Sequence, residues 1–219
     1  MTSRGERTRQ RILDEAELLY GARGVAGVSL REIRIAAGQR NTSALQFHFG
    51  GVDGLLRALA ERHMPAIGAG QERLRTELAP SDDRARPEAL IEIMVRPWAD
   101  YVRQGRGARS WVRIAADIAA RPERLWVEFR DRSPTVTVEV GSQLLEHLVT
   151  RLGPRLGLDR MMRVNLATLH LCADRARIED AAGSSQMQVV GHDEWAADLV
   201  DMAIAAMLAP SRLSTAHPR

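Results

Sequence analysis

The chain has 219 residues, of which 45% are hydrophobic and 27% charged, and its formal net charge is +3 at pH 7. This composition fits a globular protein with one small and one medium domain. No run approaches the roughly 18 apolar residues that span a membrane, and the polar, arginine-rich residues 1–10 argue against a secretory signal. Cys172, the single cysteine, excludes an internal disulfide and fits a reducing cytoplasm, where it would be an inert core residue.

The first predicted helix covers residues 8–23 and ends at Gly24. Its apolar positions follow helical spacing and form one stripe, made of Ile12, Leu13, Ala16, Leu19 and Tyr20.

Residues 29–49 predict two short helices joined by a tight turn. Ser29 and Glu32 form the S-x-x-E pattern of a capping box, in which each side chain accepts from a free backbone N–H at the helix start. Gly38 can adopt the left-handed conformation that ends such a helix, and Asn41 can cap the next helix, which begins at about Thr42. This outline is that of a helix-turn-helix.

The second of these helices has an apolar side and a polar side. Ala44, Leu45 and Phe49 would be buried, which leaves Thr42, Ser43 and Gln46 facing outward. Short polar residues at the start of this helix suit entry into the major groove of DNA, where N-terminal residues of a recognition helix meet base edges.

Residues 8–63, about a quarter of the chain, carry a series of short motifs: T-R-x-x-I-L-D-x-A from Thr8, R-G at Arg23, S-L-R-E-I from Ser29, A-G at Ala37, H-F-G from His48 and D-G-L-L from Asp53. In this order, the motifs resemble the DNA-binding domain of the TetR family of transcriptional regulators. The resemblance implies that residues 29–37 are the supporting helix and residues 42–48 the recognition helix. It also implies that the helix from Asp53 onward links the DNA-binding domain to a sensor domain.

Two positions depart from the family pattern. Gln46 and Phe47 stand where the family often has an aromatic pair with a phosphate-contacting tyrosine, and Val52 stands where it often has a lysine. Phosphate contacts must therefore come from arginines near the first helix and the turn. The predicted DNA-binding residues are Arg7, Arg9 and Arg40 for phosphates, Thr42, Ser43 and Gln46 for base edges, together with Asn41 and His48.

The distribution of charge supports this assignment. Residues 1–50 contain eight arginines and five acidic residues, whereas residues 51–219 contain 23 of each. A basic domain beside a neutral one is typical of a nucleic-acid-binding protein. All 31 basic residues are arginine, so each charged phosphate contact would be planar and potentially bidentate.

The rest of the chain predicts further helices separated by breakers. Pro65 is expected to kink or end the linking helix, and residues 80–87 form a proline-bounded polar loop. Helical spacing then covers residues 89–101, 108–120 and 122–129. Residues 135–140 alternate like a strand, but we expect a helix, because one short strand would have no partner in an otherwise helical chain.

Five of the nine aromatic residues fall between Trp98 and Phe129. Ordinary core packing explains this as well as a ligand site does, but aromatic side chains with a few polar groups are what an apolar ligand requires. The predicted effector-binding residues are Met94, Trp98, Tyr101, Trp111, Arg113, Asp117, Trp126 and His147.

The last two predicted helices cover residues 159–182 and 193–208. The final helix is apolar nearly all round, which indicates burial on more than one side, either within the monomer or across a dimer seam. The family resemblance implies a homodimer formed by these helices, with two recognition helices roughly 34 Å apart. The predicted interface residues are Leu166, Leu169, Trp195, Leu199, Met202 and Ala206.

The sequence contains no G-x-S-x-G, H-E-x-x-H, P-loop or G-x-G-x-x-G motif, and its six histidines show no metal-ligand spacing. We therefore expect no catalytic site, metal or cofactor. The expected architecture is all-α, with an N-terminal three-helix DNA-binding domain over residues 1–52, a helical ligand-binding and dimerisation domain over 53–210, and a polar tail over 211–219. The expected function is that of a repressor that leaves a palindromic operator when a small, mostly hydrophobic effector binds. The alternatives are a constitutive or architectural DNA-binding protein without an effector and, more remotely, a helical enzyme.

Overall fold

The computed structural model describes residues 4–41, 43–78, 86–121, 133–181 and 190–211, and every regular element in these ranges is helical. The predicted all-α fold is confirmed. The helices are α1 (Arg4–Arg23), α2 (Leu30–Ala36), α3 (Ala44–Phe49), α4 (Val52–Glu77), α5 (Pro87–Tyr101), α6 (Arg106–Ala119), α8 (Thr135–Leu152), α9 (Pro154–Ala181) and α10 (His192–Leu208), with short 3-10 turns at Val25–Gly27 and Val102–Gln104. Within the described ranges, none of these helices combines the length and apolarity needed to cross a bilayer.

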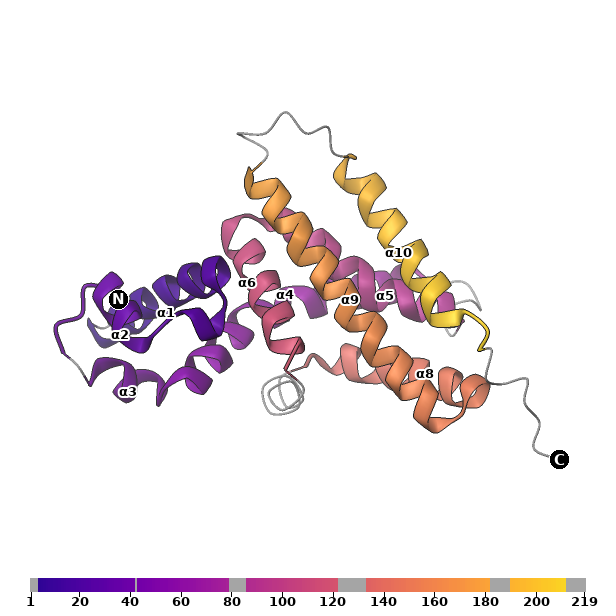
Figure 1. Ribbon diagram of the computed structural model, residues 1–219, viewed down its shortest axis with the longest axis horizontal. Coiled ribbons are helices and arrows are strands. Elements are labelled where there is room, and N and C mark those ends of the chain that lie inside the picture. Colours follow the sequence, from indigo (N-terminus) through magenta and orange to yellow (C-terminus); the bar gives the residue numbers. More distant parts are fainter. Residues whose placement is uncertain (1–3, 42, 79–85, 122–132, 182–189, 212–219) are drawn as a thin grey trace.

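Helices α1, α2 and α3 form a small lobe at the N-terminal end (Figure 1). Ile12, Ala16 and Tyr20 form the inner face of α1, and they belong to the same buried core as Ile33 of α2 and Leu45 of α3. Helix α1 ends at Gly24, whose φ of 75° lies in the left-handed region, as its sequence predicts. The stripe of apolar residues in α1 therefore positions the helix-turn-helix.

Helix α4 leads from this lobe into the larger helical domain (Figure 1). It continues through Pro65 to Glu77, so the expectation that Pro65 ends the helix is wrong. The Pro65 side chain is exposed, whereas Met64, Ile67 and Gln71 on the opposite face are buried. One uninterrupted helix thus joins the two parts of the molecule.

The larger domain is built from α5, α6, α8, α9 and α10, and α6 packs on both α1 and α9. Trp111, Ile114 and Ile118 of α6 are all buried. Residues 135–140 belong to α8, as expected, with Val136 and Val140 one helical turn apart and both buried. Cys172 lies in the core of this domain, where burial raises the pKa of its thiol to about 12. The thiol is therefore protonated at neutral pH and inert.

Close contacts fix the small lobe against the larger domain. Gly21 of α1 packs directly on Ser110 of α6, since a Cβ on Gly21 would lie 2.7 Å from the Ser110 Cβ. At the end of α1, the Val25 backbone N–H donates to the Asp117 carboxylate of α6 at 2.8 Å. Asp117 also accepts from Arg121 at 3.0 Å.

Candidate nucleic-acid interface and effector cavity

The start of α2 is fixed by the capping box that the sequence predicts. The Ser29 hydroxyl oxygen accepts from the Glu32 backbone N–H at 3.2 Å, and the Glu32 carboxylate accepts from the Ser29 backbone N–H at 2.8 Å. Arg23 pairs with the same carboxylate at 2.8 Å. The backbone hydrogen bond from Ser29, followed by those from the Ser29 hydroxyl and Arg23, lowers the pKa of Glu32 to about 2. The cap therefore stays charged across the physiological range.

The turn between α2 and α3 agrees with the sequence prediction at Gly38, where α2 ends, but differs from it at Asn41, where the next helix was expected to be capped. Gly38 has a φ of 65° and ends the first helix, and Arg34 donates to the Gln39 carbonyl at 2.6 Å. Helix α3 begins at Ala44, later than expected. The Asn41 side chain accepts from the Ser43 backbone N–H at 3.0 Å, so it forms a local turn instead of capping a helix that starts at residue 42. Thr42 lies outside the described residues.

The two faces of α3 agree with the prediction except at Phe49. Ala44 and Leu45 are buried and Ser43 and Gln46 are exposed, but Phe49, which was expected to be buried, is only half-buried. Gln46 borders a surface groove of about 370 Å³, whose other lining residues are Leu30, Arg31, Arg34 and Leu45. A glutamine beside two guanidinium groups can donate to and accept from polar edges of bases while the arginines reach phosphate oxygens.

Arg31 and Arg34 are among the arginines near the turn that the sequence offers for phosphate contacts, and they line the groove with Gln46. Their spacing of three along α2 places them side by side. Phe47 was not assigned to this surface from the sequence. Phe47 is 84% exposed, although a phenylalanine inside an amphipathic pattern is expected to be buried. An exposed aromatic ring next to Gln46 enlarges the surface that can meet DNA.

The predicted phosphate-binding arginines differ in their surroundings. Arg7 and Arg40 are exposed, as is Asn41. Arg9 is half-buried, and its guanidinium lies over the Phe49 ring at 5.2 Å from the ring centroid. Arg9 therefore ties α1 to α3 by a cation–π contact in addition to any role toward DNA. His48 is half-buried, with its ring 5.1 Å from that of Phe47 in an edge arrangement.

The junction between α3 and α4 requires glycine. A Cβ on Gly54 would lie 1.5 Å from the Phe49 carbonyl oxygen, so no other residue fits without moving α3. The close approach of these two backbones links the position of α3 to the first turn of α4.

A buried polar network lies where α1 meets α4, α5 and α6. Glu17 accepts from His63 Nε2 at 2.9 Å and from Arg62 Nη1 at 2.7 Å. His63 Nδ1 and the Tyr101 hydroxyl are 2.7 Å apart, and the His63 ring stacks on Trp111 with centroids 5.3 Å apart. Burial, followed by the charge of Glu17, raises the pKa of Tyr101 to about 12. The N-terminal lobe and the larger domain therefore share one hydrogen-bonded network.

Four residues predicted for the effector site make contacts elsewhere in the structure. Tyr101 and Trp111 belong to the network around His63. Asp117 accepts from the backbone of Val25, as described above. Arg113 pairs with Asp180 of α9 at 2.7 Å. The expectation that these four line one cavity was wrong, because the faces of α5 and α6 that carry them meet α1, α4 and α9.

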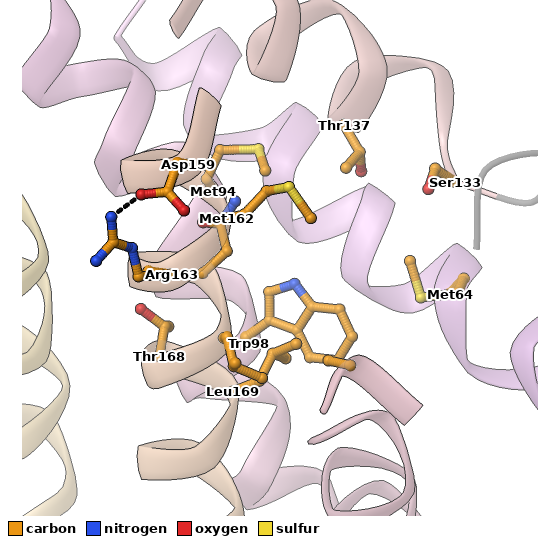
Figure 2. Close-up of a pocket in the computed structure, with 13 residues that line it drawn as sticks. Met64, Met94, Trp98, Ser133, Thr137, Asp159, Met162, Arg163, Thr168 and Leu169 are labelled. Atoms are coloured by element: carbon orange, nitrogen blue, oxygen red, sulfur yellow. Dashed lines mark ion pairs between the residues drawn. The ribbon is translucent and has the colours of Figure 1, made fainter. Parts of the chain in front are cut away.

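A cavity of about 410 Å³ lies between α4, α5, α8 and α9 (Figure 2). Met94 and Trp98, two of the predicted effector-binding residues, line it. Leu166 and Leu169, expected at a dimer seam, line it as well. The remaining lining residues are Met64, Ala119, Ser133, Thr137, Asp159, Met162, Arg163, Asn165 and Thr168. Its size and its mostly apolar wall are those of a small-molecule site.

The cavity is connected to α4 by a buried amide. The Thr137 hydroxyl, in the cavity wall, donates to Gln71 Oε1, and Gln71 Nε2 lies 3.9 Å from the sulfur of Met94, another wall residue. Gln71 is completely buried and lies on α4. A molecule that moves Met94 or Thr137 therefore acts directly on the helix that leads to α3.

Of the last two predicted effector-binding residues, His147 lies apart from this cavity and Trp126 is not described. His147 is exposed and lines a separate surface depression with Glu146, Arg151 and Leu208. Trp126 lies outside the described residues. Across the described ranges, no group of three or more His, Cys, Asp or Glu residues is arranged to bind a metal ion.

The predicted dimer residues on α10 divide into an inner and an outer set. Leu199 is only 3% exposed within the single chain, so it cannot face a partner, in contrast to the expectation. Trp195 is half-buried beneath the guanidinium of Arg175, which lies 5.3 Å from its ring centroid. Met202 is 51% exposed and Ala206 is also exposed, so these two remain available on the outside.

No family model matches the chain. No curated protein sequence matches it either. Similar solved structures include a TetR-family regulatory protein from Rhodococcus RHA1, 16% identical, with 96% of this chain and 100% of that chain covered and a TM-score of 0.45. The TetR-family regulator PfmR from Thermus thermophilus is 18% identical, with 88% and 96% covered and a TM-score of 0.45.

The multidrug binding protein EbrR, solved with imidazole, is also similar to this chain. It is 19% identical, with 94% and 97% covered and a TM-score of 0.44. The resemblance of this chain to the TetR family is therefore carried by the motifs between Thr8 and His63 and by the helix-turn-helix that they form.

Proposed function

We propose that this chain is a homodimeric transcriptional repressor that binds a palindromic DNA operator through α2 and α3. The observation that carries this proposal is the exposed face of the helix-turn-helix, where Gln46 lies in one groove with Arg31 and Arg34. The capping box, Gly38 and Gly54 hold this face rigid. Rigid presentation of a few polar side chains is what base recognition in the major groove requires.

A second copy of the chain would supply the second recognition helix. The outer surfaces of α9 and α10 carry exposed apolar side chains, among them Leu171 and Met202. Small residues such as Ala206 would let two copies of α10 approach closely. A two-fold axis beside these helices would give two half-sites about one DNA turn apart, which is why the operator is expected to be palindromic.

The cavity would be the effector site, and α4 would transmit its state. Met64 and Gln71 of α4 lie at or beside the cavity wall, and the first turn of α4 packs on the end of α3 through Gly54. The dimer would have one conformation whose recognition helices are spaced to enter adjacent major grooves and another whose spacing does not allow this. A small, mostly apolar ligand with higher affinity for the second conformation would shift the dimer away from DNA by the difference between its two affinities.

The decisive experiment is selection of bound DNA from a random pool with the purified chain. We expect an enriched inverted repeat with half-site centres about one helical turn apart. Gln46→Ala should change the enriched sequence, whereas Gln143→Ala, on an exposed position of α8, should not. Recovery of no preferred sequence would contradict the proposal. A preferred sequence that no small molecule releases would instead identify a constitutive DNA-binding protein.

A further inference from the structure

The charge and shape of the cavity wall restrict what it can bind. Resting on the proposal that this cavity is the effector site, we infer that its ligand is an uncharged, flat aromatic molecule. The inference follows from three properties of the wall: its apolar side chains, the position of its two charges, and its polar but uncharged groups.

The apolar part of the wall suits an aromatic ring. Figure 2 shows the indole of Trp98 lying among Met94, Met162 and Leu169, with Met64 at the far end. Methionine sulfur is polarizable and makes favourable contacts with aromatic rings, and its flexible side chain adapts to a flat surface. The indole offers a face on which a second ring can stack.

The charged part of the wall is already neutralised. Asp159 and Arg163 are the two charged residues among the described residues that line the cavity, and they pair with each other across one turn of α9 (Figure 2). Their side chains are 53% and 69% exposed, so the pair lies where the cavity meets solvent. Among the described lining residues, none offers an uncompensated charge to a ligand with a net charge, which weakens the binding of such a ligand strongly. Trp98, the one aromatic residue among them, also falls short of the aromatic cage that binds organic cations.

The remaining polar groups can orient a neutral ligand. Thr168 and Asn165 of α9 carry a hydroxyl and an amide into the wall, and Thr137 of α8 adds a second hydroxyl, which already donates to Gln71. An uncharged acceptor or donor on the ligand, such as a carboxamide, can pair with the Asn165 amide. These groups give orientation without requiring charge.

Three naphthalene derivatives of nearly the same shape test the inference. They are 2-naphthamide, which is uncharged, 2-naphthylmethylammonium, a cation, and 2-naphthoate, an anion. Isothermal titration calorimetry of the full-length protein at pH 7.5 should give an affinity for 2-naphthamide that exceeds the other two by about tenfold or more. Trp98→Leu should weaken 2-naphthamide by about tenfold, because the stacking face is lost.

An isosteric change in the wall should alter the preference for charge. Asn165→Asp places an unpaired carboxylate in the cavity and should raise the affinity for 2-naphthylmethylammonium by about tenfold relative to 2-naphthamide. Gln143→Glu adds the same charge to the exposed surface of α8 and should leave all three affinities unchanged. A thermal unfolding curve close to that of the wild type verifies that each variant is folded.

The outcomes separate the ligand class from the regulatory role. Tighter binding of either charged probe to the wild type, binding of none of the three, or no response to Asn165→Asp would overturn the inference. If 2-naphthamide binds best but leaves the affinity for the selected DNA unchanged, the ligand class stands and the effector role fails. If a charged probe binds best and releases the DNA, the effector role stands and the ligand class is wrong.

Discussion

Glu17 is the acidic centre of the network that joins α1 to α4, and its removal tests how the N-terminal lobe of α1, α2 and α3 is held in place. Its buried carboxylate accepts from His63 at 2.9 Å and from Arg62 at 2.7 Å. Removing one partner of a buried, hydrogen-bonded ion pair costs about 3–5 kcal/mol. Arg62 retains 23% side-chain exposure and has a second carboxylate in Asp14 at 2.9 Å. We therefore expect Glu17→Ala to lower the free energy of unfolding by about 3 kcal/mol, the lower end of that range.

The loss is measurable by thermal and urea unfolding at pH 7. For a chain of this size, 1 kcal/mol corresponds to about 2–4 °C, so the melting temperature should fall by about 6–12 °C. Glu77→Ala is the matched control, because Glu77 pairs with Arg73 at 3.5 Å on the surface of α4, where an ion pair contributes about 0–1 kcal/mol. A loss below about 1 kcal/mol for Glu17→Ala would show that the network does not hold the lobe.

The same residue predicts a dependence of stability on pH. Burial raises the pKa of Glu17, but the hydrogen bonds and charges of His63 and Arg62 outweigh it, so the pKa lies below its ordinary value of 4.5. The unfolded chain then binds this proton more readily than the folded chain, and the stabilisation is present above pH 4.5 and lost as the pH falls through the lower, folded pKa. The difference in urea midpoint between wild type and Glu17→Gln should therefore narrow below pH 4.5. A difference that stays constant in acid would contradict this account.

Three further predictions concern the DNA interface, the capping box and the dimer. Gln46→Ala should relax the sequence preference at one base position. Arg40→Ala should instead weaken the affinity for all DNA sequences alike and reduce the slope of log affinity against log salt concentration by about 1, as measured by titration of labelled DNA at several salt concentrations. Equal effects of the two variants would mean that α3 reads no base through Gln46. Ser29→Ala should lower the free energy of unfolding by about 1 kcal/mol. In an NMR titration, the same variant should move the pKa of Glu32 from about 2 toward 4.5, and an unchanged pKa would refute the role given to the capping box. Met202→Arg should convert a dimer to a folded monomer in sedimentation experiments, because this side chain is 51% exposed in the single chain, whereas Leu199→Arg should lower the melting temperature of the monomer itself. A wild-type chain that sediments as a monomer at micromolar concentration would remove the basis for the dimer.

The helix-turn-helix was predictable because its signals are local. Ser29 and Glu32 are three residues apart, and both hydrogen bonds of the cap depend only on that spacing. Gly38 likewise marks the end of α2 through its own backbone conformation. The start of α3 was less predictable, because Asn41 can either cap a helix or form a turn with Ser43, and local sequence does not decide between the two.

The position of the cavity between α4, α5, α8 and α9 depended on tertiary structure. Helical spacing identifies Trp98, Tyr101 and Trp111 as facing inward, but it does not say which neighbour each one meets. Tyr101 and Trp111 meet His63, which is 38 residues from Tyr101 in sequence, whereas Trp98 faces the cavity. Leu166 and Leu169 could not be assigned either, because an apolar residue on a long helix can face a cavity, the core or a second chain with the same spacing.

Sequence alone therefore determined most of the helical elements, the capping box and the location of the basic region, since each follows from residues within one or two helical turns or from composition. Only the folded chain decided which polar residues are paired across it. Glu17 meets His63 across 46 residues, and Asp117 meets the Val25 backbone across 92. Such pairs form because burial of apolar area brings two helix faces together. The apolar pattern of the sequence shows which positions are buried, but it does not show which distant residue a buried polar group will meet.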